Sequence, residues 1–141
     1  MGMSKHKSTR GPNMTTILII DDEQPTLQML TLYLEACGHR VLAAENEVQG
    51  LEVFRSERPA IVLTDIKMPG KDGFDVLRQI KAIAPQTEVI VITGHGDKDL
   101  AKQAIALKAS AFFNKPLDTE ALDATIREIE QRLALKLNSK H

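Results

Sequence analysis

Short, continuously apolar runs recur along this chain of 141 residues, and each is followed by a segment in which apolar residues have helical spacing. The strongest runs are residues 17–20, 60–63 and 89–92, and weaker ones lie at 40–44 and 109–113. Continuous apolar runs are typical of parallel strands that helices cover on both faces. Because strands that alternate with helices are joined by right-handed crossovers, we expect an α/β fold with five parallel strands.

Five helices are expected, one after each strand. Asn46 is expected to cap the second helix, in which Val48, Leu51 and Phe54 have the spacing of a buried face. Asp118 or Thr119 is expected to cap the fifth helix.

The fifth helix carries an apolar stripe with steps of three and four residues: Leu122, Ile126, Ile129, Leu133 and Leu137. The spacing starts like a heptad seam, so the segment around Leu133 to Leu137 is expected to extend past the sheet. An exposed apolar stripe needs a partner, which a second copy or a following domain would supply. A tail that frays beyond the packed part of the stripe is the alternative.

The length fits one domain, which we place at residues 15–133. Residues 1–14 are expected to be a flexible leader, and residues 134–141 a helix extension or linker. The sequence has no apolar run of membrane-spanning length and no signal-peptide core, and Cys37 is its single cysteine, which together indicate a cytoplasmic protein. The net charge of −1 predicts no direct binding to nucleic acid or membrane.

Polar residues follow four of the expected strands: Asp21 and Asp22, Asp65, Thr93, and Lys115. Because parallel strands end at the same edge of a sheet, these side chains are expected to lie together. Crowded carboxylates resist full ionisation, and a cation that prefers oxygen ligands, Mg²⁺ or Mn²⁺, would neutralise them. One carboxylate could then attack a phosphoryl donor, while the ammonium and the hydroxyl bind its oxygens. The pattern predicts phosphoryl transfer to an aspartate.

Four segments carry a family resemblance: residues 19–23 (IIDDE), 63–73 (LTDIKMPGKDG), 91–94 (VITG) and 114–116 (NKP). Together they resemble the motifs of two-component response-regulator receiver domains, which are CheY-like, over about residues 15–133. The resemblance implies a flavodoxin-like three-layer sandwich with strand order 2-1-3-4-5.

The resemblance also implies roles for single residues. Asp65 would be the phosphoacceptor. Asp22 and Asp65 would bind Mg²⁺ through their side chains, Lys67 would bind it through its backbone carbonyl, and Asp21 would bind it through water.

A conformational switch is implied as well. Thr93 and Phe112 would form the switch pair, with Phe112 at a position where relatives often have tyrosine. The bond between Lys115 and Pro116 is cis in such domains. His95 would either steer a water molecule near the phosphoryl site or be an ordinary exposed loop residue.

Other functions fit parts of this pattern. Phosphatases of the haloacid-dehalogenase type also phosphorylate an aspartate. Their motif is Asp-x-Asp, whereas in this sequence Lys67 stands two residues after Asp65. A degenerate receiver that serves only as a docking module would not need the full set of charged residues. A flavodoxin-like flavin binder would need a phosphate-binding loop after the first strand, which this sequence lacks.

A receiver of this kind is expected to be a regulatory phosphoacceptor that catalyses only its own phosphorylation and dephosphorylation. Its expected partner is a sensor histidine kinase or a histidine phosphotransfer protein. A homodimer through the face of helix four, strand five and helix five, and an output domain beyond His141, are further possible partners.

Overall fold

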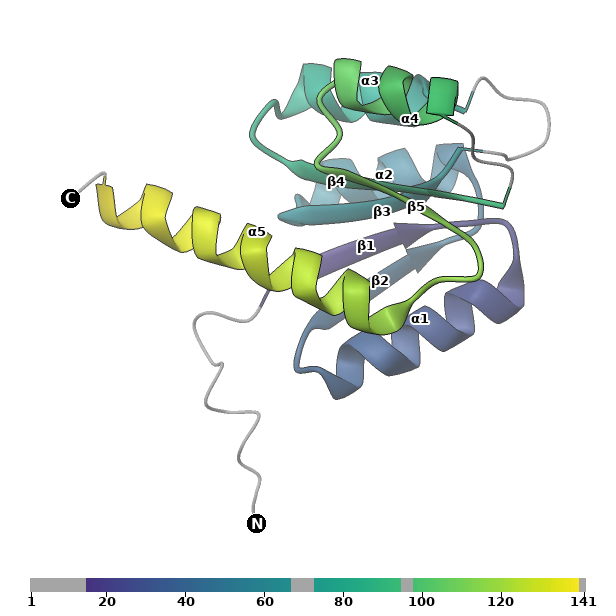
Figure 1. Cartoon of the computed structure of the whole chain (residues 1–141), viewed down its shortest axis with the longest axis horizontal. Coiled ribbons are helices and arrows are strands. Elements are labelled where there is room, and N and C mark those ends of the chain that lie inside the picture. Colours follow the sequence, from purple (N-terminus) through teal and green to yellow (C-terminus); the bar gives the residue numbers. More distant parts are fainter. Residues whose placement is uncertain (1–14, 67–72, 95–97, 140–141) are drawn as a thin grey trace, which may run out of the picture.

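Five parallel strands form one sheet in the order β2-β1-β3-β4-β5, which confirms the flavodoxin-like fold expected from the sequence (Figure 1). The computed structural model describes residues 15–66, 73–94 and 98–139. The strands are β1 (Thr16–Ile20), β2 (Arg40–Ala44), β3 (Ile61–Asp65), β4 (Glu88–Thr93) and β5 (Ala111–Asn114). The helices are α1 (Gln24–Ala36), α2 (Glu47–Glu57), α3 (Asp75–Ile83), α4 (Lys98–Ala106) and α5 (Thr119–Ser139).

Two apolar layers enclose the sheet, because successive residues of a strand point to opposite faces. On β1, Leu18 and Ile20 pack into the layer shared with α2, α3 and α4, whereas Ile17 and Ile19 pack into the layer shared with α1 and α5. All four side chains are fully buried. Figure 1 shows α1 and α5 over one face of the sheet and the other helices over the opposite face. The continuous apolar runs therefore reflect burial on both faces.

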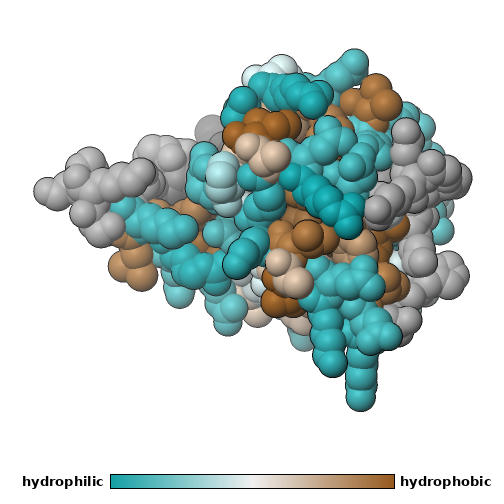
Figure 2. Space-filling model, turned by 90° about the horizontal axis from the view of Figure 1, so that it is seen from above, coloured by the Kyte–Doolittle hydropathy of each residue, from teal (hydrophilic) through white to brown (hydrophobic). Residues whose placement is uncertain are grey.

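The face seen from above is mainly hydrophilic, and its hydrophobic side chains lie in patches between polar ones (Figure 2). Among the described residues, no helix is long and apolar enough to cross a membrane. The leader expected at residues 1–14 lies outside the described residues.

The helix α2 begins as predicted, but its buried face differs. Asn46 Oδ1 accepts a hydrogen bond of 2.8 Å from the backbone N–H of Gln49, as an N-cap does. The inward orientation predicted for Val48 is wrong, because this residue is 61% exposed. Gly50 is buried instead, and a Cβ atom there would lie 2.5 Å from Ile20 Cδ1. The absent side chain lets α2 approach β1 closely. The buried face of α2 is formed by Glu47, Gly50, Leu51 and Phe54, which recur at helical spacing, and Val48 lies outside this face.

The cap of α5 is Asp118 rather than Thr119. Its Oδ1 atom accepts hydrogen bonds from the backbone N–H groups of Glu120 at 3.0 Å and Ala121 at 3.1 Å. These bonds satisfy donors of the first turn that have no partner within the helix.

The apolar stripe of α5 is buried in its first half. Leu122, Ile126 and Ile129 are buried, and Leu133 packs against the same layer from a partly exposed position. Leu135 is 66% exposed, and Figure 1 shows the last turns of α5 extending past the sheet.

Polar contacts of two residues, Glu130 and Arg132, fix the place where α5 leaves the sheet. Glu130 accepts a hydrogen bond from the Thr15 hydroxyl and lies 3.6 Å from His39 Nδ1. Two residues later, the Arg132 guanidinium pairs with Glu88 at 3.1 Å. Contacts with the amino-terminal ends of β1 and β4 thus hold the helix on both sides.

Candidate functional site

The strand register brings the predicted polar residues to one edge of the sheet. Asp21 directly follows β1, Asp65 ends β3, Thr93 ends β4 and Lys115 directly follows β5. Asp65 is paired with the residue before Thr93, and the Thr93 carbonyl accepts a hydrogen bond of 2.9 Å from the Lys115 backbone N–H. Four segments far apart in the sequence therefore meet at the carboxyl ends of the strands.

Three carboxylates are close together at this edge. Asp21, Asp22 and Asp65 each offer an oxygen atom within 4.8 Å of the others. Asp21 and Asp65 are buried, whereas Asp22 is exposed. The backbone N–H of Glu23 donates to Asp21 Oδ1 at 2.9 Å, which orients that carboxylate.

The ammonium of Lys115 lies among these carboxylates. Its Nζ atom is 2.8 Å from Asp21 Oδ2, 2.9 Å from Asp65 Oδ2 and 2.6 Å from Glu23 Oε1. Burial lowers the pKa of Lys115, but its contacts with these three carboxylates outweigh burial, so the pKa is raised above the usual lysine value. Lys115 therefore stays protonated and is a fixed positive charge.

Asp21 is the most deeply buried of the three aspartates. Burial is the largest cause of its raised pKa; the nearby charge of Asp65 adds to the rise, whereas Lys115 and the Glu23 N–H oppose it. Asp21 Oδ2 is buried and, within the described part of the chain, has an ion pair with Lys115 but no partner with hydrogen-bond geometry. A buried oxygen of this kind is available to a further cation.

The three aspartates fit a divalent cation such as Mg²⁺. Mg²⁺ favours carboxylate oxygens and retains several water molecules, so a partly exposed group of acids suits it. The buried oxygen of Asp21, which receives no hydrogen bond from the described residues, supports this fit. Lys67, the expected backbone ligand, lies outside the described residues, as does His95.

The expected switch residues lie on neighbouring strands. Thr93 is fully buried at the end of β4, and Phe112 of β5 is partly exposed and packs against the layer on the α4 side. The two strands pair in register, with Thr93 opposite Asn114. The bond between Lys115 and Pro116 is cis.

Glu23 is a contact residue of the site that the sequence did not predict. The only sequence signal was its place directly after the Asp21-Asp22 pair. Its contact with Lys115 joins residues 92 positions apart, so local sequence patterns could not reveal it.

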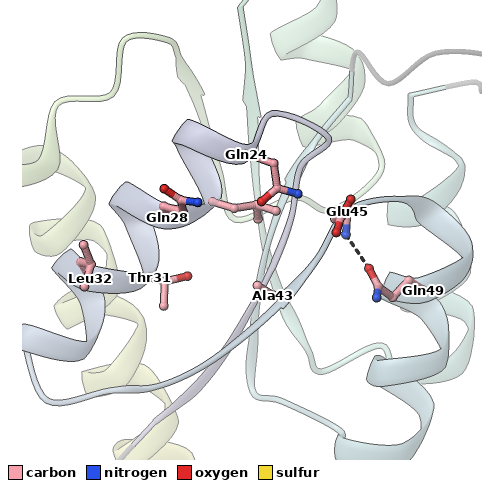
Figure 3. Close-up of a pocket in the computed structure, with 8 residues that line it drawn as sticks. Gln24, Gln28, Thr31, Leu32, Ala43, Glu45 and Gln49 are labelled. Carbon is pink, nitrogen blue, oxygen red and sulfur yellow. Dashed lines mark hydrogen bonds between the residues drawn. The ribbon is translucent and has the colours of Figure 1, made fainter.

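A groove of about 430 Å³ also has no signal in the sequence. It lies between α1, β2 and α2, and Figure 3 shows Gln24 and Gln28 on one wall and Gln49 on the other. The Gln49 side chain accepts a hydrogen bond of 2.7 Å from the Glu45 backbone N–H. The other residues that line the groove are Leu27, Thr31, Leu32 and Ala43. The groove depends on how the two helices sit against β2, which the sequence pattern does not specify.

Fold and site together define a class of signalling domain. The family model described as "Response regulator receiver domain" matches residues 17–127, well over half of the chain. The chain belongs to this family and is a receiver domain of two-component phosphorelay signalling. Receiver domains are regulatory phosphoacceptors that interact with histidine kinases or phosphotransfer proteins. Membership separates the chain from the phosphatases and flavodoxins that share parts of its pattern.

Relatives of two lengths resemble the chain. Sporulation initiation phosphotransferase F of Bacillus subtilis is 33% identical over 122 residues, which cover 86% of this chain and 96% of that protein. The crystal structure of a response regulator receiver domain protein from Clostridium thermocellum has a TM-score of 0.82 and 39% identity, covering 86% of this chain and 98% of that one.

Other relatives are much longer. The C4-dicarboxylate transport transcriptional regulatory protein DctD of Pseudomonas aeruginosa is 38% identical over 119 residues, which cover 84% of this chain and 26% of that protein. The chain thus spans nearly all of some curated relatives and about a quarter of others.

The raised pKa of Asp21 predicts a pH-dependent difference in stability between the protein and Asp21→Asn in EDTA. Below the ordinary aspartate pKa of 3.8, the carboxyl is protonated in both the folded and the unfolded chain. As the pH rises, the unfolded chain loses this proton first, so the free energy of unfolding of the wild-type protein falls relative to that of the variant until the folded pKa is passed. Urea unfolding between about pH 3 and pH 7 measures this difference. A difference that does not change with pH, or that moves in favour of the wild-type protein, contradicts the raised pKa.

Proposed function

We propose that Asp65 accepts a phosphoryl group from the phosphohistidine of a sensor histidine kinase or a histidine phosphotransfer protein. The observation that carries this proposal is the 2.9 Å contact of Asp65 Oδ2 with Lys115 Nζ beside two further aspartates. Phosphoryl transfer depends mainly on positioning and charge neutralisation, and this arrangement provides both.

The proposed chemistry uses one carboxylate oxygen of Asp65 as the nucleophile. It attacks the phosphorus atom, the new P–O bond forms as the P–N bond to the donor imidazole breaks, and the imidazole nitrogen keeps the electron pair. Lys115 donates hydrogen bonds to the phosphoryl oxygens, and the Thr93 hydroxyl donates to another of them. Later attack by water on the acyl phosphate returns the aspartate and inorganic phosphate.

The proposal assigns a Mg²⁺ site to Asp21, Asp22 and Asp65, with Mn²⁺ as the alternative ion. Following the family resemblance, Asp22 and Asp65 are direct ligands, Asp21 acts through water, and the Lys67 carbonyl completes the protein ligands. When bound, the cation offsets negative charge on the carboxylates and the phosphoryl oxygens. The buried oxygen of Asp21 and the closeness of the three acids support this assignment.

Phosphorylation should depend on Asp65 and on Mg²⁺. Incubation with acetyl phosphate and Mg²⁺ should add the mass of one phosphoryl group to the protein. The label should survive acid and be lost in alkali, because it is an acyl phosphate. Asp65→Asn should remain unlabelled, since an amide oxygen is a poor nucleophile, and intact-protein mass spectrometry reports the outcome.

Asp99→Asn provides the matched control, because it removes an exposed carboxylate on α4. It should be labelled like the wild-type protein, whereas Asp22→Ala should need more Mg²⁺ for half-maximal labelling. Labelling of Asp65→Asn would refute the assigned acceptor. An unlabelled wild-type protein would favour the alternative of a degenerate receiver that serves only as a docking module.

The switch is proposed to couple the site to the α4 and β5 surface. When the Thr93 hydroxyl turns toward the phosphoryl oxygens, it vacates space that the Phe112 ring can enter. The full burial of Thr93 and the packing of Phe112 near α4 support this coupling.

Thr93→Ala should therefore separate phosphorylation from its conformational consequence. The variant should still accept a phosphoryl group, because Asp65 and Lys115 are unchanged. NMR spectra should then show no phosphorylation-dependent shifts in α4 and β5. Thr87→Ala, the same substitution before the other end of β4, should keep those shifts. Shifts that persist unchanged in Thr93→Ala would place the coupling elsewhere.

A homodimer through the face formed by α4, β5 and α5 is the proposed response to phosphorylation, with an output domain beyond His141 as a further partner. In support, β5 is an edge strand of the sheet and Ile105 on α4 is 52% exposed. Leu135 on the extended part of α5 is exposed as well.

Sedimentation with and without beryllofluoride, a phosphoryl mimic, tests this dimer. Beryllofluoride should raise the sedimentation coefficient, and Ile105→Asp should abolish the rise because a charge cannot be buried without a partner. Glu128→Gln, an exposed position on α5, serves as the control. A monomer at every concentration in both states would exclude the dimer.

A further inference from the structure

Glu23 is a partner of Lys115 to which the proposed phosphoryl chemistry gives no role. Its Oε1 atom lies 2.6 Å from Lys115 Nζ, which is nearer than Asp21 Oδ2 at 2.8 Å or Asp65 Oδ2 at 2.9 Å. An ammonium group has three N–H donors. Glu23 and Asp65 therefore accept hydrogen bonds from two of these donors before a phosphoryl group binds, and Asp21 forms an ion pair with the same ammonium.

Local structure holds the Glu23 carboxylate close to Lys115. Glu23 is the N-cap residue of α1, and its backbone carbonyl accepts a hydrogen bond of 3.1 Å from the Leu27 N–H. The Thr26 hydroxyl donates to Glu23 Oε1 at 3.4 Å. The amino-terminal end of a helix also favours a negative charge. Glu23 thus stays near Lys115 although its side chain is 59% exposed.

The three carboxylates differ in how readily they can release Lys115. The side chain of Asp21 is fully buried and that of Asp65 is 4% exposed, so separating either one from Lys115 would leave a buried charge without compensation. The Glu23 side chain can turn into water and be rehydrated there, so its ion pair is worth little. Glu23 is therefore the partner that a bound phosphoryl group would replace with the smallest loss.

We propose that Glu23 is a positioning residue that holds the Lys115 ammonium at the rim of the site and releases it when a phosphoryl group binds at Asp65. This inference rests on the proposed function of Asp65. Because Glu23 competes with the phosphoryl oxygens for the same ammonium, it lowers the affinity of the site for a phosphoryl group. The competition acts through Lys115 and not through the net charge of the surface.

Beryllofluoride affinity in saturating Mg²⁺ tests the competition directly. Glu23→Gln keeps the size of the side chain and removes its charge, so beryllofluoride should bind about three- to fivefold more tightly. Glu45→Gln is the matched control, since it removes an exposed charge directly after β2 that has no ion pair with Lys115 among the described contacts. This control should leave the Kd unchanged.

A double-mutant cycle shows whether Glu23 acts through Lys115. In a Lys115→Ala background, Glu23→Gln should leave the beryllofluoride Kd unchanged, because the ammonium for which it competes is absent. Initial rates of phosphoryl uptake from acetyl phosphate, measured on the same four proteins, are a second readout of this double-mutant cycle. In the presence of Lys115, Glu23→Gln should raise that rate, and in its absence the rate should not change.

Three results would overturn the inference. The first is an unchanged or weaker beryllofluoride affinity in Glu23→Gln, and the second is an equal gain in Glu45→Gln. The third is an equal gain in the Lys115→Ala background, which would show a general effect of charge. If the wild-type protein bound no beryllofluoride and took up no phosphoryl group, the proposed function of Asp65 would fail together with the role of Glu23.

Discussion

The site depends on one ammonium group held among carboxylates that come from different strands. Asp21 and Asp65 are both buried, and without Lys115 their like charges would face each other away from water. Removing one partner of a buried ion pair typically costs about 3–5 kcal/mol, so this contact constrains the whole edge of the sheet. It ties the segment after β5 to the ends of β1 and β3, at a place where β5 pairs with a single neighbouring strand.

The sheet brings these charged residues together, although no local sequence pattern specifies the distances between them. Parallel register aligns the carboxyl ends of β1, β3, β4 and β5, and the helices that cover both faces fix the strands. On the opposite edge, Glu130 and Arg132 hold α5 where it leaves the sheet. One end of the domain thus carries the proposed chemistry, and the other sets the direction of the extended helix.

The sequence predicts most of the fold because burial on both faces leaves continuous apolar runs, such as residues 17–20, that helical periodicity does not produce. It fails at Val48, because the buried face of α2 includes Glu47 and Gly50, which a search for apolar spacing does not mark. The residues at the strand ends follow from topology. The contact between Glu23 and Lys115 does not, because it depends on the conformation of an exposed side chain.

A crystal structure of the protein with Mg²⁺ and beryllofluoride is the most direct test of the account. It should show beryllium bonded to an Asp65 carboxylate oxygen, with the Lys115 ammonium and the Thr93 hydroxyl hydrogen-bonded to fluorine atoms. The Glu23 carboxylate should then have moved away from Lys115. Beryllofluoride bound to another residue, or Lys115 still paired with Glu23 at saturating beryllofluoride, would contradict the account.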